Sequence, residues 1–572
     1  MSKILYDVRE TESFSALLKQ SAELFRDRPA FSVKNEKDEY EDILYPKFRE
    51  DVYSLGTGMS ERGFKDIKIA LTGDNSYEWC VSYLAVTCGL GVVVPIDKEL
   101  PAEDMAYILK HSDTNVIIAD KARTERLLEN IDIMPEKLVI ISVSNDGEHE
   151  SALDFAAILK EGRNEYLSGN TSYEDREPDP EAMTALLYTS GTTGFAKGVM
   201  LSQKNILAVI LANCKVVKIT CEDRLLSILP IHHTFECTLS FLLLMYSGGC
   251  LGFCEGLRYI PKNMKEFRPT IFVGVPLMLE KIHRKILSAA SEKKGGKLKL
   301  SVGKVIAGAG SAVGVNIKEK IFHEITKLFG GQLRLIIIGA APLDPQVVKD
   351  FRTFGLPVYL GYGLTECAPL VIGNNDYVQL HDSVGVPLPG VEARVDDPDD
   401  NNVGEILIKG PMVMLGYYNN EEATREVLTE DGWLRTGDLG TVDGENHFRI
   451  TGRKKNVIIT KNGKNIYPEE VEYYLNSNPV IAESMVVGSD SETEEDTSVI
   501  ANVFPDIEAI KEKFKLQTVS KEQVLKIVGD VIKEVNKKLP KYKNIKQFHV
   551  REQEFIKTTT QKIKRYANKE TV

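Results

Sequence analysis

The eleven residues from Tyr188 to Gly198 gather hydroxyl side chains, glycines and one lysine into a single short stretch, Tyr-Thr-Ser-Gly-Thr-Thr-Gly-Phe-Ala-Lys-Gly. Glycines let backbone N–H groups approach an anion closely, hydroxyls donate further hydrogen bonds, and Lys197 adds a full positive charge. It is not the Walker pattern, because Gly-Lys-Ser/Thr does not follow Gly194. The stretch predicts a phosphate-binding loop, the alternative being a flexible turn rich in Ser, Thr and Gly.

Five further segments accompany this loop, and each of them alone is also compatible with a turn or a solvated charge run. One ends an apolar run in small residues, which leave room for a flat ring against the backbone. Another flanks an aromatic residue with glycines and adds a hydroxyl and a carboxylate. A third contains an acid suited to vicinal ribose hydroxyls, and the last two cluster cations. In chain order they are Ile338–Leu343, Gly361–Glu366, Asp431–Gly440, Gly452–Asn456 and Lys557–Arg565.

The elements that must hold these segments alternate along the chain between helical spacing and short apolar runs. This alternation predicts layered α/β structure around a largely parallel sheet. From residue 383 to about 450, short β segments separated by Pro, Gly and Asp turns predict a small antiparallel barrel or distorted sheet. The remainder mixes strands with amphipathic helices, such as Lys521–Lys538, and predicts a separate α+β domain. The acidic, proline-containing Ser172–Pro180 predicts an exposed connector.

Composition excludes several classes of protein. The 572 residues have a net charge of −12, which argues against a nucleic-acid binder. The 8 cysteines form no Cys-x-x-Cys pair, so reduced thiols in a cytosolic compartment are expected. No apolar run is long enough to span a bilayer, while peripheral contact with a membrane stays open. Gly308–Gly314 imitates a dinucleotide fingerprint, but its third glycine is one residue late and no acid follows at the required spacing.

The motifs, in this order and over this length, resemble the adenylate-forming superfamily of acyl-CoA synthetases, luciferases and peptide-synthetase adenylation domains. Leu229–Glu236, Phe267–Lys281 and Asp431–Gly440 are similar to its long-chain fatty acid–CoA ligase branch. The resemblance implies an α/β fold of the acetyl-CoA synthetase type. Residues 1–452 would form a large N-terminal domain of layered α/β subdomains plus a small β-barrel at about 383–450. Residues 453–572 would form a mobile α+β C-terminal lid domain.

The resemblance also implies the reaction and its cofactors: ATP with Mg²⁺ activates a fatty acid as an acyl-adenylate, and CoA then receives the acyl group. Catalytic roles would fall to Lys562, His233, Lys197 and Glu366, and Glu366 with Thr189 would hold Mg²⁺. Lys455 would be the hinge of the lid and Gly463 would leave space for pantetheine. The full set implied for nucleotide and CoA binding is Thr189, Ser190, Gly191, Thr192, Thr193, Gly194, Lys197, Gly339, Ala340, Ala341, Gly361, Tyr362, Gly363, Leu364, Thr365, Asp438, Arg453, Lys455, Gly463 and Lys562.

Two departures from the family pattern stand out: Ala196 where most members have proline, and Gln561 where glycine usually precedes the terminal lysine. Several readings remain open. The acceptor is CoA or an acyl carrier protein, the acid is a fatty acid or another carboxylic acid, and a non-enzymatic nucleotide or fatty-acid sensor is a third class. Either His233 or His232 would lie at the substrate carboxyl group, or the histidine would serve only core packing. Lys455 is alternatively an exposed cation without a special role.

Three apolar stretches, Leu239–Met245, Ile271–Val275 and Leu335–Ile338, have the composition of an acyl-chain tunnel. The same residues suit the ordinary core of an α/β domain, and periodicity does not separate the two readings. Acyl chain length therefore rests on the resemblance.

Overall fold

The computed structural model describes residues 3–144, 149–189, 196–292, 326–460, 464–489, 498–558 and 563–568. Internal contacts divide the chain into two compact units. The first unit combines Met1–Glu392 with Ile408–Leu434, and the second combines Ala393–Leu407 with Arg435–Val572. The expected domain boundary at 452/453 stays a prediction.

An eight-stranded sheet of the first unit carries the glycine- and hydroxyl-rich loop. Its order is β19 (Gly416–Tyr417), β9 (Lys197–Ser202), β8 (Met183–Thr189), β4 (Gly91–Pro95), β3 (Ile67–Thr72), β5 (Val116–Ala119), β6 (Val139–Ser142) and β7 (Leu153–Asp154). The strands from β8 to β7 pair in parallel. At the other end β8, β9 and β19 pair antiparallel, so the loop joins two neighbouring strands as a hairpin.

A nine-stranded sheet of the same unit holds the two glycine-containing segments near residues 340 and 362. Its order is β16 (Val386–Pro387), β15 (Ile372–Gly373), β14 (Val358–Tyr362), β13 (Leu335–Ile338), β12 (Ile271–Gly274), β10 (Arg224–Ser227), β11 (Cys250–Phe253), β1 (Pro29–Lys34) and β2 (Tyr40–Leu44). Strands β11, β10, β12, β13 and β14 are parallel. Their carboxyl ends therefore meet at one edge.

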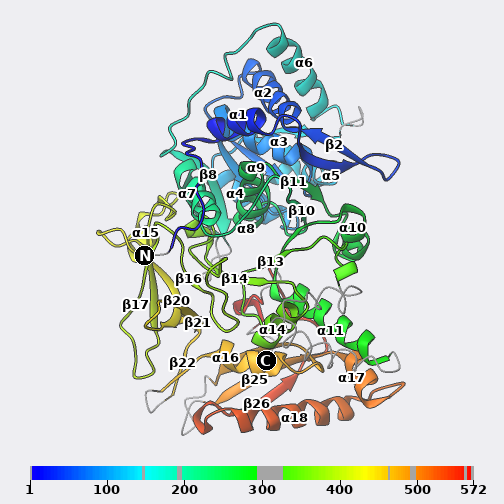
Figure 1. Cartoon of the computed structure of the whole chain (residues 1–572), viewed down its shortest axis with the longest axis vertical. Coiled ribbons are helices and arrows are strands. Elements are labelled where there is room, and N and C mark those ends of the chain that lie inside the picture. Colours follow the sequence, from blue (N-terminus) through cyan, green and yellow to red (C-terminus); the bar gives the residue numbers. More distant parts are fainter. Residues whose placement is uncertain are drawn as a thin grey trace, which may run out of the picture. The chain divides into compact units, whose positions relative to one another are not determined.

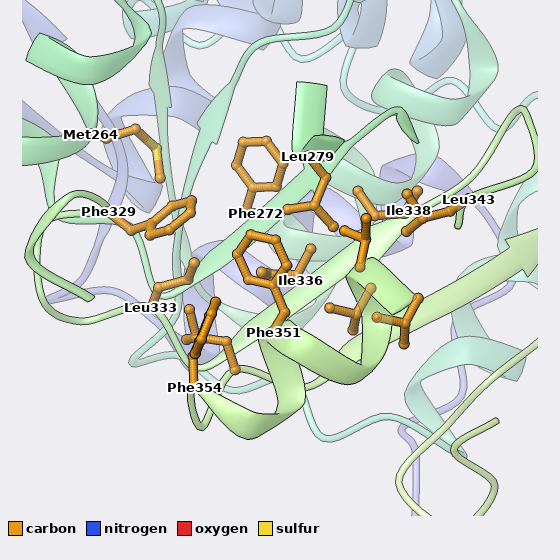
Figure 2. Packing of buried hydrophobic residues seen from close by; sticks show 14 of the residues in the cluster. Met264, Phe272, Leu279, Phe329, Leu333, Ile336, Ile338, Leu343, Phe351 and Phe354 are labelled. Carbon is orange, nitrogen blue, oxygen red and sulfur yellow. The ribbon is translucent and has the colours of Figure 1, made fainter. Parts of the chain in front are cut away.

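One hydrophobic core lies against this sheet and includes Phe272, Ile336 and Ile338 (Figure 2). Helices α10 (Ile260–Phe267), α11 (Pro276–Glu292) and α14 (Pro345–Thr353) complete it with side chains that include Met264, Leu279 and Phe351. Of the two readings left open for the apolar stretches, core packing therefore holds for these strand residues. Burial of such side chains contributes about 1.5–3 kcal/mol each, which fixes the strands that carry the site.

The helices of the first unit begin with local sequence signals. Ser13 caps the first of them by accepting from the N–H of Ala16, and Ser202 and Asn205 form a reciprocal capping box on α7. Helix α2 packs against α6 (Figure 1). The helices are α1 (Phe14–Leu24), α2 (Tyr45–Glu61), α3 (Tyr77–Ala85), α4 (Ala102–His111), α5 (Lys121–Glu129), α6 (Phe155–Leu167), α7 (Gln203–Cys214), α8 (Thr234–Glu236), α9 (Leu243–Ser247), α10 (Ile260–Phe267), α11 (Pro276–Glu292), α14 (Pro345–Thr353) and α15 (Glu421–Val427).

The second unit contains a four-stranded sheet and an α+β layer. The sheet has the order β17 (Glu392–Asp396), β18 (Gly404–Lys409), β20 (Leu434–Val442) and β21 (Phe448–Arg453). The α+β layer contains β24 (Ile481–Gly488), β25 (Val499–Pro505), β26 (Ile545–Val550), α16 (Pro468–Asn476), α17 (Ile507–Phe514) and α18 (Lys521–Lys538). A short ribbon of β22 (Ile458–Ile459) and β23 (Asn465–Ile466) precedes α16.

The predicted α/β class is confirmed, and α18 has the predicted bounds because Val524, Val528 and Val531 form one apolar face of the helix. The connector at Ser172–Pro180 differs from its prediction at one position. Tyr173 is 1% exposed and donates from its hydroxyl to the carbonyl of Ala85. Within the described residues, no helix is both long and apolar enough to cross a membrane.

Candidate active site

The two ends of the phosphate-loop hairpin lie opposite each other. In the register of β8 and β9, Thr189 pairs with Lys197 and Tyr188 pairs with Gly198. The structure thus brings the predicted threonine and lysine together at the mouth of the loop. Ser190, Gly191, Thr192, Thr193 and Gly194 lie outside the described residues.

Tyr417 joins Lys197 to Glu366. The Nζ of Lys197 lies 4.9 Å from the centre of the Tyr417 ring, within cation–π range. The Tyr417 hydroxyl donates to Glu366 Oε1 at 2.9 Å. Tyr417 is not among the residues predicted from the sequence, because nothing in Gly416-Tyr417-Tyr418 indicates proximity to either partner. Only the pairing of β19 with β9, which sets Tyr417 opposite Val199, reveals it.

Two of the segments implied for nucleotide binding follow neighbouring parallel strands. Gly339, Ala340 and Ala341 follow β13, while Gly361 and Tyr362 end β14, and Ile338 pairs with Leu360. The last predicted members of this group, Gly363, Leu364 and Thr365, continue directly towards Glu366. All these residues are therefore at one edge of the nine-stranded sheet, as the chain order of parallel strands requires.

Two backbone features distinguish this edge. Ala340 has φ +75°, a left-handed conformation that costs a residue with a Cβ about 1–2 kcal/mol. Such strain is concentrated at functional sites. At Gly363, a Cβ would lie 1.9 Å from the carbonyl oxygen of Pro369. The glycine is thus required by close backbone packing, whatever ligand the edge binds.

In the second unit, the acid and the arginine predicted for ribose are direct cross-strand neighbours. Asp438 on β20 pairs with Arg453 on β21, and Arg453 Nε lies 2.6 Å from Asp438 Oδ1. The Asp438 side chain is 7% exposed, whereas that of Arg453 is 43% exposed. A largely buried carboxylate is thereby balanced by a cation that also reaches solvent.

The predicted hinge residue Lys455 lies in the short turn Lys454–Asn456 directly after β21 and is exposed. Gly463 lies outside the described residues. The structure therefore leaves open whether Lys455 is a hinge or an exposed cation.

Lys562 also lies outside the described residues, but its flanks are firmly held. Lys557 forms an antiparallel bridge with Ile563 and an ion pair with Glu483 at 2.5 Å. Arg565 contacts both oxygens of the partly buried Glu472, at 2.5 and 2.6 Å. The described residues on either side of Lys562 are thus each held by defined contacts.

The two adjacent histidines differ in environment. His232 is 8% exposed, and burial, with the nearby charge of Lys98, lowers its pKa to about 3. His232 is therefore neutral throughout the physiological range. His233 is less buried and its ring centre lies 4.2 Å from that of His232. This arrangement favours His233 as the residue that reaches a substrate and His232 as its support.

Asn75 fixes the segment that leads into these histidines. Its Nδ2 donates to Ser227 Oγ at 2.8 Å and to the carbonyl of Leu229 at 2.7 Å, while its Oδ1 accepts from the N–H of Ile231 at 3.0 Å. Asn75 follows β3 of the eight-stranded sheet, whereas Ser227 ends β10 of the nine-stranded one. The amide thus ties the two sheets together beside the histidines, a role that no local sequence signal predicts.

Glu236, at the end of α8, is a buried acid without a basic partner among the contacts described for it. It is 1% exposed and accepts from Ser227 Oγ at 2.6 Å and from Ser240 Oγ at 2.9 Å. Burial raises its pKa to about 7, although both serine hydrogen bonds oppose the rise. Glu236 is therefore protonated in a substantial fraction of molecules at neutral pH.

We expect the stability of the Glu236→Gln variant to increase relative to that of wild type as the pH rises. The pKa of Glu236 is raised from 4.5 to about 7 in the folded chain, so folded wild type holds an extra proton between these values. Its stability must fall as pH rises through that window, by about 3 kcal/mol in total. The amide does not titrate. Thermal midpoints of both proteins at pH 5 and pH 8 measure the difference, and an equal offset at the two pH values would contradict it.

The donor set near the loop suits Mg²⁺, which prefers oxygen ligands and keeps several waters. Glu366 Oε1 accepts from Tyr417, and no other side chain within the described residues bonds to Oε2. Among those residues, no group of three or more His, Cys, Asp or Glu side chains is arranged to hold a metal. The single carboxylate is compatible with a cation that is shared with phosphate oxygens.

Comparison with known proteins supplies relatives over nearly the whole chain. The family described as AMP-binding enzyme matches residues 18–418, and the AMP-binding enzyme C-terminal domain matches residues 455–572. Long-chain-fatty-acid–CoA ligase 5 of Rattus norvegicus is 31% identical over 84% of this chain and 74% of its own. The chloroplastic long-chain-fatty-acid–[acyl-carrier-protein] ligase AEE15 of Arabidopsis thaliana is 28% identical over 84% of this chain and 75% of its own.

Two solved structures show the same fold. ATP-bound MatB from Rhodopseudomonas palustris is 24% identical, with a TM-score of 0.71 over 97% of this chain and 98% of its own. The anthranilate CoA ligase AuaEII in complex with anthranoyl-AMP is 19% identical, with a TM-score of 0.77 over 98% of this chain and 97% of its own.

Proposed function

The chain belongs to the AMP-binding enzyme family, and we propose that it is an AMP-forming ligase that activates a long-chain fatty acid and transfers it to CoA. The fatty-acid carboxylate attacks the α-phosphorus of ATP, which forms the acyl-adenylate and releases pyrophosphate. The CoA thiol then attacks the carbonyl of this mixed anhydride, which forms the thioester and releases AMP. The observation that carries the proposal is the meeting of Lys197 and Glu366 at Tyr417.

The first step brings two anions together, so it needs cations and directed N–H donors rather than a general base. The loop from Thr189 to Lys197 would bind the β- and γ-phosphates. Mg²⁺ would be held by Glu366 and Thr189, and when bound it neutralises charge on the phosphate oxygens. Lys562 would bridge the fatty-acid carboxylate and the α-phosphate.

Gly339, Ala340, Ala341 and Tyr362 would enclose adenine, and the rest of Gly361–Thr365 would also contact the nucleotide. Asp438 would accept hydrogen bonds from the ribose hydroxyls. Arg453 orients Asp438, because its Nε contacts Oδ1 at 2.6 Å. His233 would contact the acid substrate, with neutral His232 packed beside it.

The second step requires the charge of Lys562 to leave and a path for the pantetheine thiol to open. A rotation at Lys455 would achieve both and would bring Gly463 to the thiol path. The protein would act in the cytoplasm, and contact with a membrane surface remains a separate prediction.

An acyl carrier protein as acceptor is the second candidate, and similarity to the AEE15 ligase favours keeping it. The direct test incubates the protein with ATP, Mg²⁺, fatty acids of several lengths, and either CoA or acyl carrier protein. We expect fatty-acid-dependent AMP release with CoA and formation of acyl-CoA. If no acyl-CoA formed at any chain length but acyl carrier protein became acylated, the carrier protein would be the acceptor instead of CoA. If none of the acids tested gave an adenylate, the protein would instead be a nucleotide or fatty-acid sensor.

A further inference from the structure

Tyr417 occupies an unusual position, because two functional groups of opposite charge contact different parts of one buried side chain. The Lys197 ammonium lies 4.9 Å from the ring centre, and Glu366 Oε1 accepts from the hydroxyl at 2.9 Å. The residue is 8% exposed. Lys197 follows the loop and Glu366 follows β14, so the tyrosine links the loop of one sheet to a strand end of the other.

The tyrosine itself has little freedom to move. Its strand pairs with β9, which begins at Lys197, so the ring and the lysine are fixed by the same ladder. The N–H of Tyr417 donates to Thr424 Oγ1 at 2.9 Å. Gly416, just before it, has φ +139°, and a Cβ there would lie 2.9 Å from Thr424 Cγ2. These restraints hold the hydroxyl in one place relative to the backbone of the loop strand.

The hydrogen bond selects one orientation of the carboxylate. Oε1 accepts from the phenol, so Oε2 is the oxygen that is left for a cation. The backbone carbonyl of Glu366 accepts from the N–H of Met414 at 2.9 Å, which anchors the same residue a second time. A carboxylate with a fixed rotamer loses less entropy when it binds a metal than a free one does. The ring face likewise confines the long, flexible Lys197 side chain.

We propose that Tyr417 is a positioning residue shared by the loop lysine and the cation-binding carboxylate. Its hydroxyl orients Glu366 for Mg²⁺ and its ring confines Lys197 for the phosphates, before the nucleotide arrives. This inference rests on the proposed function, because it assigns the two partners to a triphosphate and its cation. The hydroxyl therefore affects only the binding of the metal, whereas the ring affects the binding of the phosphates.

Two substitutions separate these contributions. Tyr417→Phe keeps the ring and removes the hydroxyl, whereas Tyr417→Leu removes both. The matched control is Tyr418→Phe, since that neighbouring hydroxyl donates to Asp113 at 3.3 Å rather than to Glu366. ATP binding is measured by calorimetry on the full chain without fatty acid, first with EDTA and then over a series of Mg²⁺ concentrations.

For Tyr417→Phe we expect about a tenfold rise in the Mg²⁺ concentration at half saturation, since a hydrogen bond to a charged group is lost. Its metal-free affinity for ATP stays within about twofold of wild type. Tyr417→Leu shows the same metal defect and also a metal-free loss of about threefold, as expected for a lost cation–π contact. Tyr418→Phe behaves as wild type.

The inference fails if Tyr417→Phe needs no more Mg²⁺ than wild type, or if its metal-free affinity falls as much as its metal-dependent one. Adding Tyr417→Phe to Glu366→Gln provides a second check, which holds even if one variant is less stable. The double variant should need no more Mg²⁺ than Glu366→Gln alone. If the two substitutions raised the required Mg²⁺ concentration additively, Tyr417 would not act through Glu366. Wild type that binds Mg²⁺ and ATP but forms no adenylate contradicts the proposed function without touching this inference.

Discussion

Replacing Lys562 with alanine is expected to slow adenylate formation by about 10²–10³-fold, while thioester formation from supplied acyl-adenylate stays within a fewfold of wild type. The first step brings a carboxylate to an α-phosphate, and loss of an aimed charge in such a site typically costs this much. The second step starts from a mixed anhydride in which those two groups are already joined. The lysine therefore has no comparable partner in that step.

The measurement separates the two half-reactions. Pyrophosphate release with ATP and fatty acid reports the first, and acyl-CoA formation from purified acyl-adenylate and CoA reports the second. Lys564→Ala is a matched control, because it removes the same charge two residues further on while its backbone N–H still donates to Ile556. Equal losses in both half-reactions for Lys562→Ala would argue against a lysine that serves only adenylation.

Glu366→Gln is expected to lower the rate of adenylation by about 10²-fold at a fixed Mg²⁺ concentration. The amide keeps the shape of the side chain and still accepts from Tyr417, but it removes the negative charge that a hard divalent cation requires. Part of the activity should return as the Mg²⁺ concentration is raised, because the substitution lowers the affinity for the metal and leaves the groups that act on the substrate in place.

A Mg²⁺ titration of the initial rate tests this expectation. Asp376→Asn is the matched control, since Asp376 Oδ1 also accepts from a tyrosine hydroxyl, that of Tyr359 at 2.7 Å, in a contact unrelated to the loop. This control should alter stability without changing the dependence on Mg²⁺. A Glu366→Gln variant with the same Mg²⁺ dependence as wild type would remove Glu366 from the metal site.

Several local features of the chain are explained by the residues within or directly beside them. Helix α18 has the predicted bounds because Ser520 and Gln523 form a capping box and the apolar residues recur at helical spacing. The hairpin at Thr189 and Lys197 follows from apolar runs on either side of a glycine-rich turn. Asp438 and Arg453 lie on the consecutive strands β20 and β21, whose antiparallel pairing makes them direct neighbours.

The departure from expectation at Ser172–Pro180 is long-range. This segment reads as an exposed connector, yet Tyr173 is buried against Gly56 and Gly89, positions at which a Cβ would approach its ring to 2.2 and 2.7 Å. The decisive partners belong to segments that the local pattern does not identify. At Gly363, backbone packing against Pro369 requires glycine, and its contact with a nucleotide stays a prediction.

By itself, the sequence determined the α/β class, and it predicts a phosphate-type loop with its charged residues, since both are encoded in consecutive residues with a characteristic spacing. Only the tertiary structure decided that Tyr417 joins Lys197 to Glu366, that Asn75 holds the histidine segment, and that burial gives Glu236 a pKa of about 7. The physical reason is that strand order and burial depend on how distant segments pack together. No local run of side chains specifies that packing.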